Sequence, residues 1–123
     1  VLELKTGFSA AHRLVDYPGA CNNIHGHNWK VAIKVAAHEL DGAGMAMDMA
    51  DLKQKLTNLV SPFDHTTLND KEPFDKMNPT SENVARFFFQ KIDKVLPDNI
   101  QLREVTVQES DDFSVTYSEL QGK

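Results

Sequence analysis

The sequence has only one cysteine, Cys21, and no long apolar run. A lone thiol excludes an internal disulfide, so Cys21 is packing, a metal ligand or a reactive group, and it suits a reducing compartment. No apolar stretch reaches membrane-spanning length, and the opening residues "VLELKTGFSAAHRL" lack the basic start and apolar core of a secretion signal. We therefore expect a soluble, cytoplasmic protein without membrane contacts.

Positive charge is also scarce, because 13 basic residues face 18 acidic ones and the net charge is -5. This balance argues against nucleic-acid binding through a broad basic face, and an anionic substrate would need a local basic pocket. The chain of 123 residues has the length of one domain, and it contains no repeat or linker segment. We expect a single domain over residues 1–123.

Two strands are predicted in the first third of the chain. Apolar and polar residues alternate from Leu2 to His12, with a break at Gly7, and alternate again from His25 to Val35. His12 falls on the apolar face of its strand. His25 and His27 are two residues apart, so they point to one face of theirs.

Two helices are predicted next. Asp48 can cap a helix whose apolar residues recur at helical spacing as far as Val60, and Thr80 can cap a second helix that ends before Pro97. The segment between them, from Phe63 to Asn78, shows no clean period and is expected to be a long ordered loop.

Two further strands end the chain, around Leu102 to Glu109 and around Phe113 to Tyr117, with the short turn "SDD" between them. The element order is therefore ββααββ. This order favours an α+β fold with a four-stranded antiparallel sheet and both helices packed on one face. The other face of the sheet is left to be covered.

The histidines are candidates for a metal site. Side chains two residues apart on a strand lie about 6.5 to 7 Å apart at their β-carbons, so one ion can reach both His25 and His27. If the first two strands pair, His12 can supply a third nitrogen. Three histidines with an open position are typical of catalytic zinc. The alternative is that these are separate histidines satisfied by ordinary hydrogen bonds.

Four other residues could carry chemistry. Cys21 could be a fourth zinc ligand, a base or nucleophile beside the metal, or an inert packed thiol. Asp64 and His65 are adjacent, so the carboxylate could orient the imidazole for proton transfer, or form a simple turn beside a surface histidine. Glu109 shares the parity of buried positions and needs a cationic or donating partner, which a structural ion pair would also provide.

Five motifs together resemble one family. They are "FSAAHR" at 8–13, "CNNIHGHNW" at 21–29, "DHTTLND" at 64–70, "NPTSENVA" at 78–85 and "VQES" at 107–110. In this order, and over nearly the whole chain, they are similar to those of the 6-pyruvoyltetrahydropterin synthase and 6-carboxytetrahydropterin synthase family. The combination of Cys-x-x-x-His-Gly-His with Asp-His-x-x-Leu-Asn makes the resemblance specific.

The resemblance implies a tunnelling fold, in which the sheets of several subunits form a barrel in a homo-oligomer, a hexamer or tetramer, with active sites between subunits. It implies that His12, His25 and His27 bind zinc and that Cys21 is the general base. Asp64 and His65 would complete the proton relay.

The remaining site residues implied by the family bind the substrate. Glu109 would hold the pterin, because a carboxylate can accept two parallel hydrogen bonds from the ring N3–H and the 2-amino group. Thr80 and Ser81 would help through nearby backbone groups. The implied substrate is 7,8-dihydroneopterin triphosphate.

The spacing of the cysteine motif bears on the product. Three residues, "NNI", separate Cys21 from His25, as in the bacterial carboxy enzymes of the queuosine pathway, which release acetaldehyde and triphosphate and leave 6-carboxy-5,6,7,8-tetrahydropterin. The two asparagines resemble the pyruvoyl enzymes, so 6-pyruvoyltetrahydropterin synthase is the alternative. A non-catalytic zinc module closed by Cys21 is a further alternative from another class.

Overall fold

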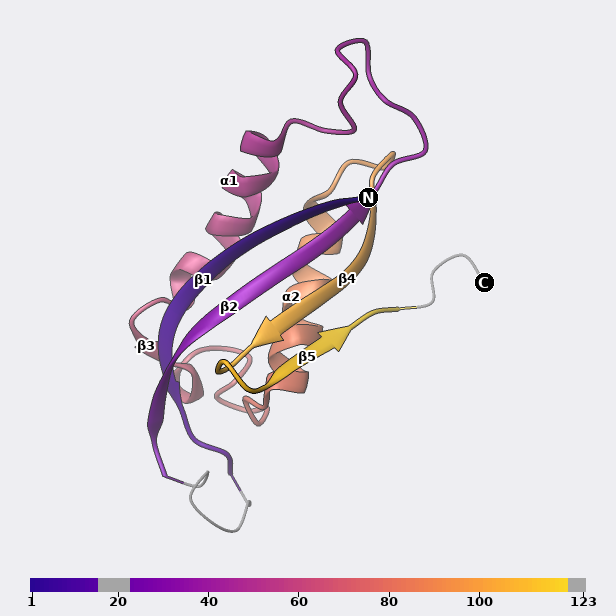
Figure 1. Ribbon diagram of the computed structural model, residues 1–123. Helices are drawn as coiled ribbons and strands as arrows, with labels where there is room; N and C mark the ends of the chain where they lie inside the picture. The colour runs from indigo at the N-terminus through magenta and orange to yellow at the C-terminus, as the bar shows by residue number, and fades with distance from the viewer. Residues whose placement is uncertain (16–22, 120–123) are drawn as a thin grey trace.

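The computed structural model describes residues 1–15 and 23–119. Five strands form one sheet, with the order β3 (Thr66–Thr67), β1 (Leu2–His12), β2 (His25–Ala36), β4 (Gln101–Gln108) and β5 (Ser114–Tyr117). The helices α1 (Met49–Val60) and α2 (Ser81–Val95) both lie on the same side of it (Figure 1). The α+β fold with two helices on one face is therefore confirmed.

The sheet differs from the expectation in one strand. The four long strands pair in antiparallel fashion as expected, but β3 adds a fifth strand that runs parallel to β1 beside Ala10 and Ala11. The prediction of a four-stranded, purely antiparallel sheet was therefore wrong. A two-residue strand has no periodicity of its own, and β1 supplies all of its pairing.

The segment that contains β3 is otherwise irregular, as expected. Two short 3₁₀ turns flank the strand, at Ser61–Phe63 and Leu68–Asp70. Phe63, Leu68 and Phe74 of this segment are buried in the core. The expected long loop is therefore ordered because its own apolar side chains anchor it.

The alternation breaks at Gly7, but β1 runs from Leu2 to His12 as expected, and its register with β2 is continuous. A β-carbon at Gly7 would lie 2.8 Å from the backbone oxygen of Trp29. Glycine here allows the two strands to approach closely. It interrupts the hydrophobic pattern without interrupting the strand.

Both helices begin where their caps were expected. The side chain of Asp48 accepts a hydrogen bond from the Ala50 amide, and the side chain of Thr80 accepts one from the Asn83 amide. Each cap satisfies an amide of the first turn that has no partner within its helix. The apolar faces of the helices then pack on the sheet around Trp29, which is 1% exposed.

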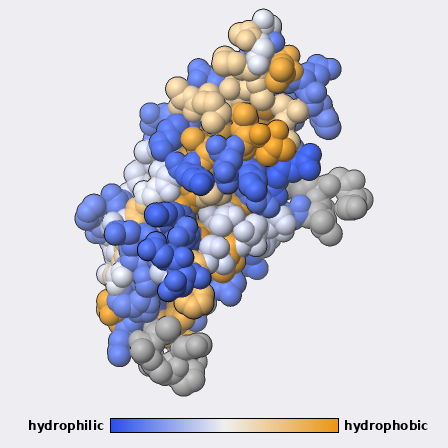
Figure 2. All heavy atoms as spheres, viewed as in Figure 1, coloured by the Kyte–Doolittle hydropathy of each residue, from blue (hydrophilic) through white to orange (hydrophobic). Residues whose placement is uncertain are grey.

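The sheet face without helices is polar. Side chains of both charges, with threonine and glutamine, alternate with the buried ones along β1, β2 and β4. Figure 2 views the sheet from this side and shows hydrophilic residues across its middle. They include Glu3, Lys5, Lys30, Lys34, Glu104, Thr106 and Gln108.

Within the described residues, neither helix has the length and apolar content needed to span a membrane.

Candidate metal centre

The three predicted histidine ligands lie together on the helix-facing side of the sheet. In the β1–β2 pairing, His12 is opposite His25 and Ala10 is opposite His27. Cross-strand partners share a face, and His25 and His27 share a face because they are two residues apart. The register of one strand pair therefore gathers all three imidazoles.

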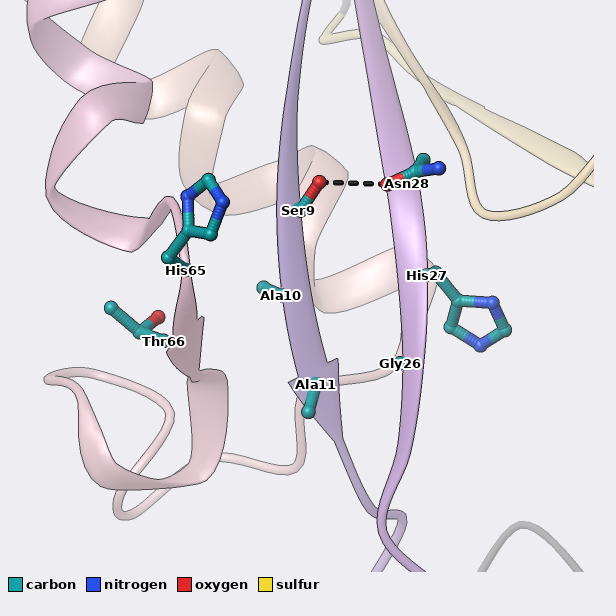
Figure 3. A pocket seen from close by; sticks show the side chains of 8 residues that line it. All are labelled: Ser9, Ala10, Ala11, Gly26, His27, Asn28, His65 and Thr66. Carbon is teal, nitrogen blue, oxygen red and sulfur yellow. Dashed lines mark hydrogen bonds between the residues drawn. The ribbon is translucent and has the colours of Figure 1, made fainter.

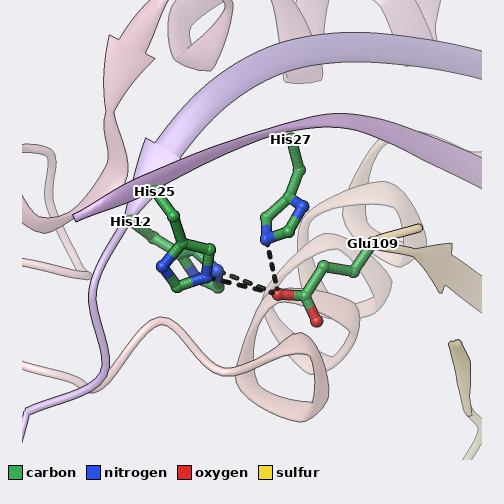
Figure 4. Close-up of side chains that lie close together, drawn as sticks. All are labelled: His12, His25, His27 and Glu109. Atoms are coloured by element: carbon green, nitrogen blue, oxygen red, sulfur yellow. Dashed lines mark hydrogen bonds and ion pairs between the residues drawn. The ribbon is translucent and has the colours of Figure 1, made fainter. Parts of the chain in front are cut away.

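Glu109 completes this cluster from the end of β4 (Figure 4). Its Oε1 lies 2.9 Å from His12 Nε2, 3.0 Å from His27 Nε2 and 4.0 Å from His25 Nε2. The four ligand atoms all lie within 4.8 Å of one another. These groups are close enough to hold one metal ion together.

Hydrogen bonds to backbone carbonyls determine which nitrogen of two histidines is free. Nδ1 of His12 lies 2.8 Å from the Pro79 oxygen, and Nδ1 of His25 lies 2.8 Å from the Asn23 oxygen. A carbonyl oxygen can only accept, so each Nδ1 carries the proton. When neutral, both imidazoles therefore direct a lone pair from Nε2 into the cluster. This is the usual outer hydrogen bond of a metal-bound histidine.

The third histidine, His27, has a buried ring nitrogen without a hydrogen-bond partner among the described residues. Its Nε2 is buried, and within the described residues it has no hydrogen bond, although Glu109 Oε1 is only 3.0 Å away. The distance is short, but the direction does not suit a hydrogen bond. Burial lowers the pKa of His27, and the charge of Glu109 opposes this only in part. A neutral imidazole is the form that binds a metal.

The donor set fits a divalent transition metal. Imidazole nitrogens and one carboxylate oxygen are ligands that zinc accepts, and the unsatisfied Nε2 of His27 gains a partner when an ion binds. Similar donors also bind copper, iron and nickel. The four residues thus form a cluster that could hold a divalent metal ion.

The beginning of α2 supports the cluster. Pro79 accepts the hydrogen bond from His12, and Ser81 Oγ donates to Glu109 Oε2 at 3.1 Å. Thr80, predicted to assist substrate binding, uses its side chain as the helix cap. The hydroxyl contact of Ser81 was not predicted. The sequence could have indicated this contact, because Ser81 directly follows the N-cap residue Thr80. A side chain at that position can contact groups beyond the N-terminus of the helix.

Asp64 and His65 form the predicted pair, but away from the histidine cluster. His65 Nδ1 lies 3.0 Å from Asp64 Oδ2, and the His65 side chain is 83% exposed. The Ser9 amide donates to Asp64 Oδ1 at 2.8 Å, and this hydrogen bond is the main reason why the pKa of Asp64 is lowered. His65 has a φ of 58°, an unusual backbone conformation for a non-glycine residue.

An open pocket of about 370 Å³ lies beside this pair, with Ala11 and Gly26 among its lining residues. The Ser9 hydroxyl donates to Asn28 Oδ1 at 2.7 Å across β1 and β2. Figure 3 shows His65 on one side of the strands, while the ring of His27 points away on the other. Sequence reasoning missed this role of Ser9 and Asn28, which only strand pairing reveals. His65 and His27 thus line the same pocket, but in the described part of the chain their rings point away from each other.

Cys21 lies outside the described residues. Its predicted role as general base therefore stays a prediction. The strand before the gap ends at His12, and the strand after it begins at His25.

Comparison with known proteins agrees with these features. A family model described as 6-pyruvoyl tetrahydropterin synthase matches residues 2–120. A putative 6-carboxy-5,6,7,8-tetrahydropterin synthase of Archaeoglobus fulgidus is 35% identical over 113 residues, covering 91% of this chain and 90% of its own. The 6-pyruvoyl tetrahydrobiopterin synthase of Homo sapiens is 36% identical over 127 residues, covering 92% and 87%.

A solved structure shows the same fold. The Caenorhabditis elegans 6-pyruvoyl tetrahydropterin synthase superposes with a TM-score of 0.85 at 34% identity, and the match covers 96% of this chain and 94% of that one. Family, fold and the clustered histidines agree over nearly the whole chain. The chain therefore belongs to the 6-pyruvoyl tetrahydropterin synthase family, a family of pterin synthases.

Proposed function

We propose that this protein is a zinc-dependent lyase that converts 7,8-dihydroneopterin triphosphate to 6-carboxy-5,6,7,8-tetrahydropterin, with release of acetaldehyde and triphosphate. The observation that carries the proposal is the cluster of His12, His25 and His27, whose ligand atoms converge with an oxygen of Glu109. Zinc bound there would supply a Lewis acid that acidifies the C–H bond beside the substrate's side-chain hydroxyls.

The residues of the chain supply the proton transfers and the orientation. Cys21, as the thiolate, removes the acidified proton, and the Asp64–His65 pair moves protons to and from the side-chain oxygens. Glu109 orients the ring by accepting from N3–H and the 2-amino group. The Ser9 amide is the main cause of the lowered pKa of Asp64, and it holds this carboxylate beside His65.

The exposure of His65 supports an active site shared between subunits. Its imidazole projects into solvent, away from the histidine cluster of its own chain. A residue in this position can complete the site of a neighbouring chain. We therefore propose a homo-oligomer, a hexamer or tetramer, in which Asp64 and His65 of one subunit serve the metal centre of the next.

The short connection between Cys21 and His25 supports the carboxy product. Three residues separate Cys21 from His25, and we take this short spacing to favour a thiol near the bound side chain. Carbon–carbon cleavage would release the outer two carbons as acetaldehyde after loss of triphosphate, and a metal held by His12, His25 and His27 would supply the Lewis acidity for this cleavage. The pyruvoyl product is the alternative, since relatives with either name are similar in identity, at 35% and 36%.

Product analysis tests the proposal. The zinc-loaded protein is incubated with 7,8-dihydroneopterin triphosphate, volatile aldehyde is trapped as a hydrazone, and the pterin is identified by mass. We expect acetaldehyde and the 6-carboxy product in equal amounts. A 6-pyruvoyl product without acetaldehyde would contradict the assignment as a 6-carboxy enzyme. The broader assignment as a pterin synthase would still stand.

Replacement of Cys21 distinguishes the two hypotheses, a zinc enzyme and a structural zinc module. Cys21→Ala should keep its metal and lose turnover by about 10²- to 10⁴-fold, because a proton-transfer step loses its base. If the metal is lost as well, Cys21 was a ligand. A closed site of that kind would have no position for substrate.

A further inference from the structure

Glu109 lies too close to the three histidines to act only on the pterin. Its Oε1 is 2.9 Å from His12 Nε2 and 3.0 Å from His27 Nε2. We propose that Glu109 is a fourth metal ligand in the resting protein and that pterin binding withdraws it. This inference rests on the proposed function, because it gives the pterin anchor a second, competing role at the same site.

The distribution of protons supports the proposal. The Nδ1 protons of His12 and His25 are used by the carbonyl oxygens of Pro79 and Asn23. In the neutral rings, both Nε2 lone pairs are directed toward a carboxylate oxygen that also carries lone pairs. Nε2 of His12 lies at hydrogen-bond distance from Glu109 Oε1, and only a proton or a metal ion between two such atoms makes their contact attractive. A metal ion makes each of these contacts attractive.

The distances agree with the fourth corner of a tetrahedral site. Zinc bonds of about 2.0 to 2.1 Å place the ligand atoms of a tetrahedron about 3.3 Å apart. Oε1 of Glu109 lies 2.9, 3.0 and 4.0 Å from the three Nε2 atoms. These values lie on both sides of the ideal spacing, so the carboxylate occupies the position that a substrate oxygen would need.

The second oxygen of Glu109 is also in use. Ser81 Oγ donates to Oε2 at 3.1 Å and fixes the plane of the carboxylate, so that Oε1 faces the histidines. A pterin needs both oxygens for its two parallel hydrogen bonds. An Oε1 directed at the metal and an Oε2 held by Ser81 compete with the alignment that two parallel pterin hydrogen bonds need, so we expect a bound pterin to withdraw Glu109 from the metal.

This competition couples binding of the pterin ring at Glu109 to binding of the pterin side chain at the metal. At rest, the carboxylate covers the metal and reduces its charge. When a pterin takes both oxygens, the fourth position opens beside the pterin's own side chain. Because coupling is reciprocal, the metal must weaken the binding of a pterin that has no side chain to offer it.

The first experiment measures the resting coordination in the cobalt-loaded full chain. Glu109→Ala should change the visible absorption spectrum of bound Co²⁺ and weaken Co²⁺ binding at least about tenfold. Glu104→Ala is the matched control, because Glu104 lies on β4, which ends just before Glu109, and pairs with Lys34 on the opposite side of the sheet. The control should change neither quantity. An unaltered spectrum and affinity in Glu109→Ala would overturn the proposal.

The second experiment uses the wild-type chain and unsubstituted pterin, which has no side-chain hydroxyl. Pterin should alter the Co²⁺ spectrum as Glu109 leaves, and should bind the metal-free protein at least about fivefold more tightly than the metal-loaded protein. Equal affinities with an unaltered spectrum would overturn the proposal even if the Glu109 variant does not fold.

The product assay separates this inference from the proposed function. If the 6-carboxy product forms while Glu109→Ala leaves the Co²⁺ spectrum unaltered, the function stands and the resting ligand is refuted. If the spectra change as expected while no pterin product forms, the resting ligand is supported and the proposed activity fails.

Discussion

The histidine cluster and the Asp64–His65 pair are two candidate catalytic regions with opposite surroundings. The cluster is built on two long strands, and His12 is only 1% exposed. The pair belongs to an irregular segment, and the His65 side chain is 83% exposed. The cluster gathers four potential metal ligands within one chain, whereas the pair presents its imidazole to solvent.

The difference has a physical cause. Strand pairing places side chains at fixed positions, so ligands on β1 and β2 are preorganised by the same hydrogen bonds that form the sheet. The pair is held mainly by Ser9, whose amide binds Asp64 and whose carbonyl accepts from the His65 amide. A loop attached to a strand edge can present a side chain outward, toward another molecule.

Loss of a cluster histidine should have the largest effect. His27→Ala or His25→Ala removes one of the converging nitrogens, so bound metal should fall from about one ion per chain to nearly none. Elemental analysis of the purified proteins measures this. His38→Ala is the control, because His38 is exposed and outside the cluster. Full metal retention in both folded variants would refute the site.

Loss of the exposed imidazole should affect turnover without affecting the fold. His65→Ala should lower kcat by about 10²- to 10⁴-fold, because a proton-transfer group is removed. Its free energy of unfolding should stay within about 0.5 kcal/mol of the wild-type value, because the side chain is exposed. Urea unfolding and steady-state assays measure both quantities.

Mixed oligomers test whether the pair serves another chain. Cys21→Ala and His65→Ala are each expected to be inactive, and mixing them under subunit-exchange conditions should restore part of the activity. The restored sites combine an intact pair from one subunit with an intact thiol from the next. A fully active monomer in sedimentation would contradict the shared site.

A substitution at Gly7 tests whether the histidine cluster depends on the close pairing of β1 and β2. In Gly7→Ala, the new β-carbon meets the Trp29 oxygen at 2.8 Å, so β1 and β2 must separate. We expect a stability loss of about 1 to 3 kcal/mol and weaker metal binding. Gly42→Ala is the control, since nothing lies within 4 Å of its β-carbon. Equal stability and metal affinity in both variants would argue against strand pairing as the source of the cluster.

The smallest expected effect concerns the acid limb of stability. The Ser9 amide is the main cause of the lowered pKa of Asp64, so the charged carboxylate is favoured in the folded state. Its stabilisation is present above the unfolded-state pKa, near 3.9, and is lost as the pH falls through the lower folded value. The stability difference between wild type and Asp64→Asn should therefore shrink below about pH 4 in urea unfolding. A difference independent of pH would contradict this origin.

Much of the fold could be predicted because its signals are local. Alternation places β1 and β2 within a residue of their observed ends, and the caps Asp48 and Thr80 mark both helix starts. At Gly7 the pattern records only a missing side chain, and not the close strand contact that requires glycine there. β3 could not be predicted, since its two residues become a strand only beside β1.

The sequence by itself determined the candidate ligands. His25 and His27 face one way because strand side chains alternate, and the five motifs indicated the family before any contact was known. Only the tertiary structure decided what converges. The β1–β2 register brings His12 to His25 and the end of β4 brings Glu109 to all three histidines, while the start of α2 supplies Pro79 and Ser81. These contacts join residues up to 97 positions apart, and a distance of that kind is set by chain packing, which no local pattern records.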